Sequence, residues 1–142
     1  MNMLRIVFAI LPLAVAQIPQ STLVGFAQVV APFESECICE THVDPLLIKK
    51  WIFEHSFPQD PCFKCYIKCV FRRINLINFD GTFSLEENSN LNNYVPGRTP
   101  EITIPCITQT SNITDVCEKA YEFSLCVQNA MIKNAQQTTT TP

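Results

Sequence analysis

Glycine is scarce in this chain, with three among 142 residues. The sequence also lacks runs of alternating apolar and polar residues beside hairpin dipeptides, which are the usual sign of paired antiparallel strands. Apolar residues recur instead at intervals of three and four, the period of an amphipathic helix. We therefore expect an all-α protein, and the length indicates one domain.

Beyond the first residues, the chain has no apolar run of the roughly 20 residues that a membrane-spanning helix requires. The apolar run at residues 6–16 is too short, follows Arg5 and ends in the small-x-small pattern Ala14-Val15-Ala16. We predict that residues 1–16 are a signal peptide and that residues 17–135 form a secreted, extracellular helical domain. The Thr-rich tail, residues 136–142, is expected to be disordered.

Convergent catalytic or metal-binding side chains are also lacking. The nearest approach to an acid–base pair is His42 with Asp44, but Asp44 precedes a proline and is explained as a helix N-cap. The Asp80-Gly81 turn lacks the alternating oxygen ligands of a calcium loop. We therefore expect no enzyme activity, no metal and no cofactor.

Positive charge is sparse, and the formal net charge is −3. Lys64, Lys68, Arg72 and Arg73 are spread along one predicted helix, as on a solvated helix face. We expect no nucleic-acid partner and no membrane insertion.

N-terminal helix signals recur along the chain. Each has an Asp, Ser or Thr N-cap, followed by proline at the first helical position or by Glu three residues on. β-Branched residues and Pro105 predict that the fourth of these helices is short or distorted, whereas the last runs to about Lys133. The signals predict helices that start after Asp44, Asp60, Ser84, Thr99 and Asp115.

Cysteine is abundant, and all eight cysteines follow the predicted leader, so an oxidising compartment should pair them. Side chains four residues apart on a helix have Cβ atoms about 5–6 Å apart, whereas a disulfide needs roughly 3.5–4.5 Å. Cys65 and Cys69 must therefore reach two different partners. Cys117 and Cys126 lie nine residues apart and point to opposite sides of their helix, so this helix should be bonded to two neighbours.

The order Cys39-x25-Cys65-x3-Cys69-x36-Cys106-x10-Cys117-x8-Cys126 resembles the six-cysteine signature of insect odorant-binding proteins. Two segments resemble that family as well. Residues 65–87, CYIKCVFRRINLINFDGTFSLEE, look like its Cys-x3-Cys helix followed by an Asp-Gly turn. Residues 117–126, CEKAYEFSLC, look like its penultimate cysteine helix.

This resemblance implies a disulfide-bonded domain of about six helices around an internal apolar cavity. It also implies a bridge from Cys69 to Cys39 or Cys37, a choice that the spacing leaves open. The other implied bridges are Cys65–Cys117 and Cys106–Cys126. Of Cys37 and Cys39, the one left over is expected to bond Cys62 in a fourth bridge.

Aromatic residues are plentiful, with ten Phe, three Tyr and one Trp, and sites for small molecules are mostly apolar. We predict that the chain is a non-catalytic carrier of a small hydrophobic ligand, an odorant or pheromone, in chemosensory transport. The Tyr121 hydroxyl is a candidate to orient a ligand oxygen. The candidate wall residues are Trp51, Phe71, Ile74, Phe83, Leu91, Ile107, Tyr121 and Phe123.

An alternative is a secreted interaction protein of the same fold, acting on a protein partner in reproductive fluid or haemolymph. A carrier would be a monomer or weak dimer, with a chemoreceptor as a further candidate partner. Asn112-Ile113-Thr114 is an N-glycosylation acceptor pattern, which we expect to be exposed at Asn112.

Overall fold

The computed structural model describes residues 17–138, and in this range it is all-helical apart from one isolated bridge between Ile77 and Phe83. The expected all-α class is confirmed. The predicted signal peptide, residues 1–16, and residues 139–142 lie outside the described range. The elements are α1 (Gln20–Val30), η1 (Ala31–Phe33), α2 (Glu34–Thr41), α3 (Pro45–Glu54), α4 (Pro61–Arg73), α5 (Leu85–Tyr94), α6 (Pro100–Thr110) and α7 (Val116–Thr138).

The first three of these elements follow one another without a break. Pro32 lies in the 3-10 turn between them, and a proline bends a helix because it has no backbone N–H to donate. Counted as one bent helix, α1, η1 and α2 bring the described chain to six helical segments. This agrees with the expected number.

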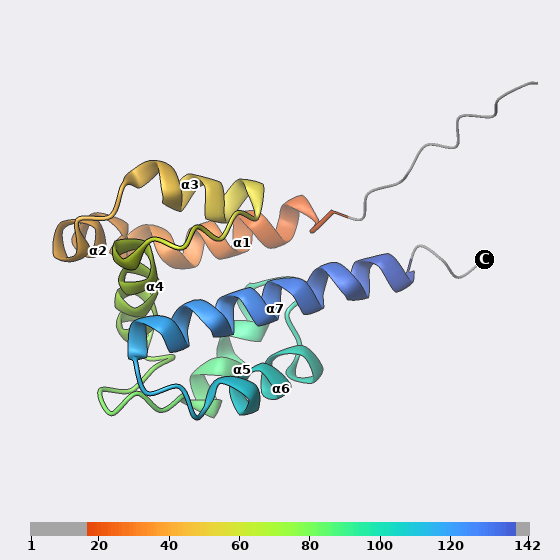
Figure 1. The fold of residues 1–142 in the computed structure, drawn as a ribbon. Helices are drawn as coiled ribbons and strands as arrows, with labels where there is room; N and C mark the ends of the chain where they lie inside the picture. The colour runs from red at the N-terminus through yellow and green to blue at the C-terminus, as the bar shows by residue number, and fades with distance from the viewer. Residues whose placement is uncertain (1–16, 139–142) are drawn as a thin grey trace, which may run out of the picture.

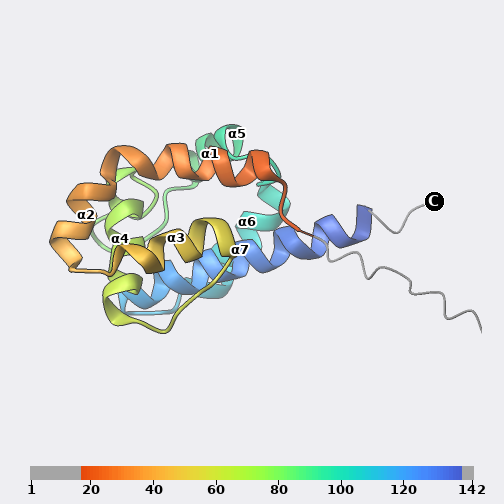
Figure 2. The same ribbon diagram turned by 90° about the horizontal axis from the view of Figure 1, so that it is seen from above.

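The helices form two layers joined by α4. In Figure 1, α1 and α3 lie on one side, α7 lies on the other with α5 and α6, and α4 runs between the two layers. Figure 2 shows α2 and α4 together at one end of the molecule, while the C-terminal part of α7 extends at the other end. None of these helices combines the length and hydrophobicity that crossing a membrane would take.

All five predicted helix starts are confirmed, four of them by side-chain caps, whereas Thr99 precedes α6 without a side-chain cap. The carboxylate of Asp44 accepts a hydrogen bond from Leu46 N at 2.9 Å, and that of Asp60 accepts one from Phe63 N at 2.7 Å. The Ser84 hydroxyl and the Asp115 carboxylate act in the same way at the starts of α5 and α7. These side chains satisfy backbone donors that the first turn of a helix leaves without a partner.

Two helices are longer than expected. α6 is a continuous 11-residue helix with Pro105 inside it, and the missing Pro105 N–H removes a single bond, to the carbonyl of Glu101, which is at an exposed position. α7 continues beyond Lys133 to Thr138, so residues 136–138 are helical although the tail was expected to be disordered. Ala and Gln in this stretch favour helix.

Three disulfides connect four of the helices. Cys37 bonds Cys69, which joins α2 to α4, and Cys65 bonds Cys117, which joins α4 to α7. Cys106 bonds Cys126, which joins α6 to α7. Cys65 and Cys69 therefore have different partners, and Cys117 and Cys126 reach two neighbouring helices.

The expected fourth bridge is not formed. Its two cysteines, Cys39 and Cys62, are unbonded and exposed. Cys37, which is fully buried, faces α4. Residues two apart on a helix point about 200° away from each other. Cys39 therefore lies on the side of α2 that faces away from α4 and from Cys62.

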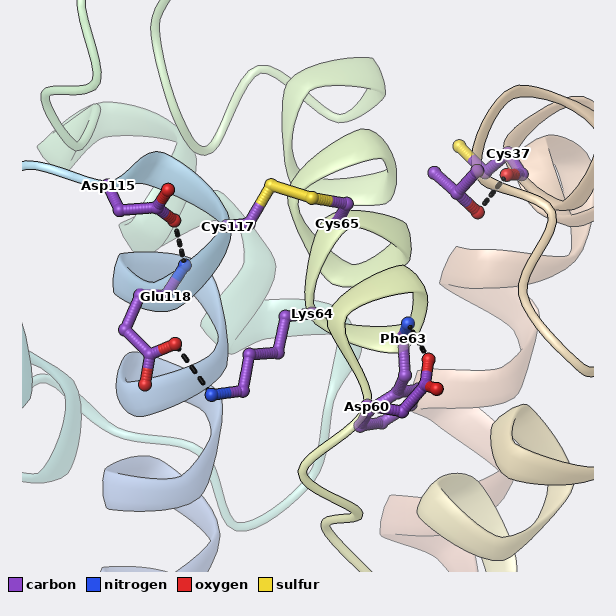
Figure 3. Close-up of a disulfide and its surroundings, with 9 residues drawn as sticks. Cys37, Asp60, Phe63, Lys64, Cys65, Asp115, Cys117 and Glu118 are labelled. Atoms are coloured by element: carbon purple, nitrogen blue, oxygen red, sulfur yellow. Dashed lines mark hydrogen bonds and ion pairs between the residues drawn. A yellow bond between two sulfur atoms is a disulfide. The ribbon is translucent and has the colours of Figure 1, made fainter.

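Figure 3 shows how the Cys65–Cys117 bridge joins the second turn of α4 to the first turn of α7. Beside it, Lys64 Nζ donates to Glu118 Oε2 at 2.6 Å. This hydrogen bond raises the pKa of Lys64. The two helix starts are thus held by a covalent bond and an ion pair.

Candidate ligand pocket

A cavity of about 80 Å³ lies among α1, α3, α4, α5 and α7. Helices from both layers supply its wall, together with residue 18 and the loops that follow α3 and α5. Most of the lining side chains are apolar, as is usual in sites for small molecules. The lining residues are Ile18, Thr22, Leu23, Phe26, Trp51, Ile52, His55, Phe57, Phe71, Leu91, Val95, Arg98, Phe123, Ser124, Val127, Gln128 and Met131.

Trp51 of α3 is the centre of the aromatic packing beside the cavity. Its ring meets Phe26 of α1 edge-on at 4.9 Å between ring centroids and Phe63 of α4 at 5.7 Å. Phe57 and Tyr66 also pack edge-on against it, each at 6.4 Å. Because edge-to-face contacts favour one ring orientation over others, the Trp51 indole is fixed as a wall of the pocket.

Several polar groups of the lining are occupied by the protein itself. The Thr22 hydroxyl donates to the Pro96 carbonyl at 2.6 Å, which fastens α1 to the loop after α5. The Gln128 amide donates to the His55 carbonyl at 3.1 Å, which fastens α7 to the end of α3. These bonds connect the helices around the pocket.

Arg98 is the one lining residue that carries a fixed positive charge. It is 7% exposed, and its nitrogens donate to the Asn88 carbonyl, to Asn88 Oδ1 and to Asn92 Oδ1. Its guanidinium lies over the Phe123 ring at 5.8 Å. Burial lowers the pKa of Arg98 to about 10, so the side chain is a cation at neutral pH.

The structure places some of the predicted wall residues in the pocket lining and others outside it. Trp51, Phe71, Leu91 and Phe123 line the pocket. Ile74 lies in a second, separate hollow, where Leu91 also takes part. Whether any of these residues contacts a ligand stays a prediction.

The other predicted wall residues are not part of the pocket lining. Phe83 packs behind the wall, with its ring 4.7 Å from that of Phe123, and Ile107 of α6 is half-buried against the core. Tyr121 is buried, and its hydroxyl donates to the Phe57 carbonyl and accepts from the Gln59 amide, each at 2.9 Å. That hydroxyl therefore fastens the loop before α4 to α7.

Sequence reasoning missed the contributions of α1 and of the loop after α5. Thr22 and Phe26 lie on a helix whose N-cap is Pro19, without a side-chain cap, so no local signal marked its start. Arg98 follows the Pro96-Gly97 turn in a polar segment, and no pattern in the sequence marked it as a pocket residue. The sequence offered one indirect signal for Arg98, its place between a turn and an N-cap threonine. What distinguishes Arg98 from an ordinary loop arginine is its burial, which the sequence does not show.

The predicted glycosylation residue, Asn112, is exposed in the turn between α6 and α7. Among residues 17–138, no cluster of three or more His, Cys, Asp or Glu has a metal-binding arrangement.

The size of the cavity limits what it can hold. An engineered cavity of roughly 150 Å³ binds benzene, so about 80 Å³ admits a slender group without rearrangement. A larger ligand needs lining side chains to move. Met131 is a half-buried residue of the lining, and methionine adapts readily because it is unbranched and flexible.

Comparisons with known proteins identify the family of the chain. The family model described as the PBP/GOBP family matches residues 20–130. General odorant-binding protein 99a of Drosophila melanogaster is 24% identical over 112 residues, which cover 74% of this chain and 76% of that protein. No solved structure matches the chain. The family match covers more than half of the chain, from the start of α1 into α7, and the chain therefore belongs to the PBP/GOBP family of insect odorant-binding proteins.

Proposed function

We propose that this protein is a secreted, non-catalytic carrier that holds one small hydrophobic ligand in the pocket between α1, α3, α4, α5 and α7. The observation that carries the proposal is the apolar cavity, whose lining residues, except Ile18 and Met131, lie in the part of the chain matched by the family. Removing the apolar surface of a ligand from water contributes about 25 cal/mol per Å² to its affinity. An odorant or pheromone in chemosensory transport fits this chemistry.

Displacement of a fluorescent apolar probe tests the carrier function. The oxidised protein should bind N-phenyl-1-naphthylamine, and volatile apolar compounds should displace it in proportion to their fit. Val127→Phe adds a ring to a lining residue that is 7% exposed, so it should weaken probe binding. Ile132→Phe enlarges a residue of the same helix outside the lining and serves as the matched control. A folded protein that binds no probe contradicts the carrier function.

The alternative, a secreted interaction protein, is favoured by one observation. The cavity is small and most of the core is filled by side chains, such as the fully buried Phe63, Tyr66 and Ile67. Absence of probe binding, together with specific capture of a protein from reproductive fluid or haemolymph, would support this alternative.

Secretion belongs to the same proposal. N-terminal sequencing of the protein from its native fluid should give a mature chain that begins near Gln17. A chain that retains residues 1–16 would contradict the predicted signal peptide.

A further inference from the structure

Arg98 is a buried cation without an acidic partner. The ion pairs among residues 17–138 join Lys64 to Glu118 and Arg73 to Glu36 and Glu40. The groups that accept from Arg98 are a backbone carbonyl and two side-chain amides, all of them neutral. A buried charge is costly unless an opposite charge compensates it, and here the protein supplies dipoles and one aromatic face.

The guanidinium also has N–H groups that these three hydrogen bonds do not use. Its five N–H groups include two on Nη1, and these are matched by the Asn88 carbonyl and Asn92 Oδ1. Nη2 donates once, to Asn88 Oδ1. The remaining hydrogens belong to Nε and Nη2, adjacent nitrogens of the planar fork that pairs with a carboxylate through two hydrogen bonds.

The surroundings of Arg98 are those of an amphipathic site. The side chain lines the pocket beside Leu91, Val95 and Phe123. Its hydrogen bonds hold the guanidinium against α5, and it lies over the ring of Phe123, another lining residue. A ligand can therefore satisfy the charge with one end while its chain contacts the apolar wall.

We propose that the pocket selects amphipathic ligands with a carboxylate, of the medium-chain fatty acid class, and that Arg98 binds the carboxylate. This inference rests on the proposed carrier function and names its ligand class. One buried cation matches one negative charge, and a carboxylic acid supplies one at neutral pH. A medium-chain alkyl group is larger than a cavity of about 80 Å³, so its entry requires lining side chains such as Met131 to move.

A comparison of three ligands with the same chain tests the proposal on the unmodified protein. Decanoic acid, 1-decanol and methyl decanoate should compete with N-phenyl-1-naphthylamine at neutral pH and below the concentration at which the acid aggregates. A hydrogen-bonded charge pair predicts that the acid displaces the probe at about tenfold to a hundredfold lower concentration than the alcohol or the ester.

Variants test whether Arg98 is responsible for the preference for the acid over the alcohol and the ester. Arg98→Met should remove the preference for the acid and leave binding of decanol as it was. Arg98→Lys keeps the charge without the fork, so it should retain a smaller preference. Lys119→Met is the matched control, because Lys119 is also a buried cation but bonds the Gly81 carbonyl and lies outside the lining. This control should keep the preference for the acid.

The outcomes separate the two proposals. If the alcohol and the ester bind as tightly as the acid, the role of Arg98 is overturned and the carrier function stands. If Lys119→Met abolishes the preference as fully as Arg98→Met does, the general field of the protein is responsible and the assignment to Arg98 is overturned. If the probe does not bind at all, the carrier function itself fails. Should Arg98→Met not fold, Arg98→Lys and the unmodified protein decide.

Discussion

At the scale of single residues, Tyr66 contains a polar group that the fold leaves without a partner. The side chain is fully buried beside Trp51, and its hydroxyl has no hydrogen-bond partner in the structure. An unsatisfied buried hydroxyl costs free energy, whereas a phenyl ring of the same shape does not. Tyr121 is the opposite case, since its hydroxyl has both a donor and an acceptor.

Tyr66→Phe is therefore expected to leave the free energy of unfolding unchanged or to raise it by up to about 1 kcal/mol. Tyr121→Phe removes the same atom from a satisfied position and should lower that free energy by about 1–2 kcal/mol. Denaturant unfolding of the two variants measures the contrast. Equal losses of stability in both would show that the Tyr66 hydroxyl has a partner.

Tyr66 also predicts a change of stability at alkaline pH. Burial, with a smaller effect from Glu34, raises the pKa of Tyr66 above its ordinary value of 10.0. Above that pH the unfolded chain loses the phenolic proton while the folded chain keeps it, so the stabilisation present below pH 10 is lost as pH rises. The free energy of unfolding should therefore fall relative to that of Tyr66→Phe from pH 10 upward. A difference that is independent of pH would contradict the raised pKa.

At the scale of helices, the contact between α1 and the end of α5 depends on Gly25. A Cβ atom at this position would lie 2.7 Å from the Tyr94 carbonyl oxygen and 3.1 Å from Pro96 Cδ. The first distance involves backbone and is too short to be tolerated. The two segments can therefore approach this closely because residue 25 has no side chain.

Gly25→Ala should destabilise the protein by at least about 1 kcal/mol, although alanine is the better helix former by a similar amount. It should also weaken probe binding, because α1 carries Phe26 and is bonded to Pro96 through Thr22. Thermal unfolding and probe titration measure both effects. Gln28→Ala, at an exposed position of α1, is the control and should change neither. A more stable Gly25→Ala would show that α1 shifts without cost.

Helix starts were predictable because a cap acts over three residues, as at Asp60, whereas α1 has no side-chain cap and was missed. The wall of the pocket was predictable in part. The helical period indicates which face is buried, but it does not tell whether that face meets side chains or empty space. Trp51 and Phe83 illustrate this limit, because both are inward-facing aromatics and the first alone lines the cavity.

At the scale of the whole molecule, the bridges connect α2, α4, α7 and α6 in series. The resemblance to a family implied these partners and left open whether Cys37 or Cys39 bonds Cys69. The open choice is settled by which cysteine of α2 faces α4, a tertiary property that spacing does not contain. Each bridge is expected to stabilise the fold by roughly 3–4 kcal/mol.

Alkylation without reduction tests the state of the two remaining cysteines. The structure predicts two reactive thiols, at Cys39 and Cys62, because both are exposed and unbonded. Peptide mass spectrometry should find the label on these residues, and Cys39→Ser with Cys62→Ser should abolish it without loss of helicity. An intact protein that takes up no label and is monomeric would instead contain the fourth bridge.

The distribution of the bridges has a consequence for the two sides of the pocket. The α4 and α7 side belongs to the covalently connected series, whereas α1, α3 and α5 contain no cysteine. The helices of that second side are held by packing and by single hydrogen bonds such as Thr22 to Pro96. The cavity thus has one covalently anchored wall and one wall held by non-covalent contacts, so a change in its volume would not require any disulfide to move.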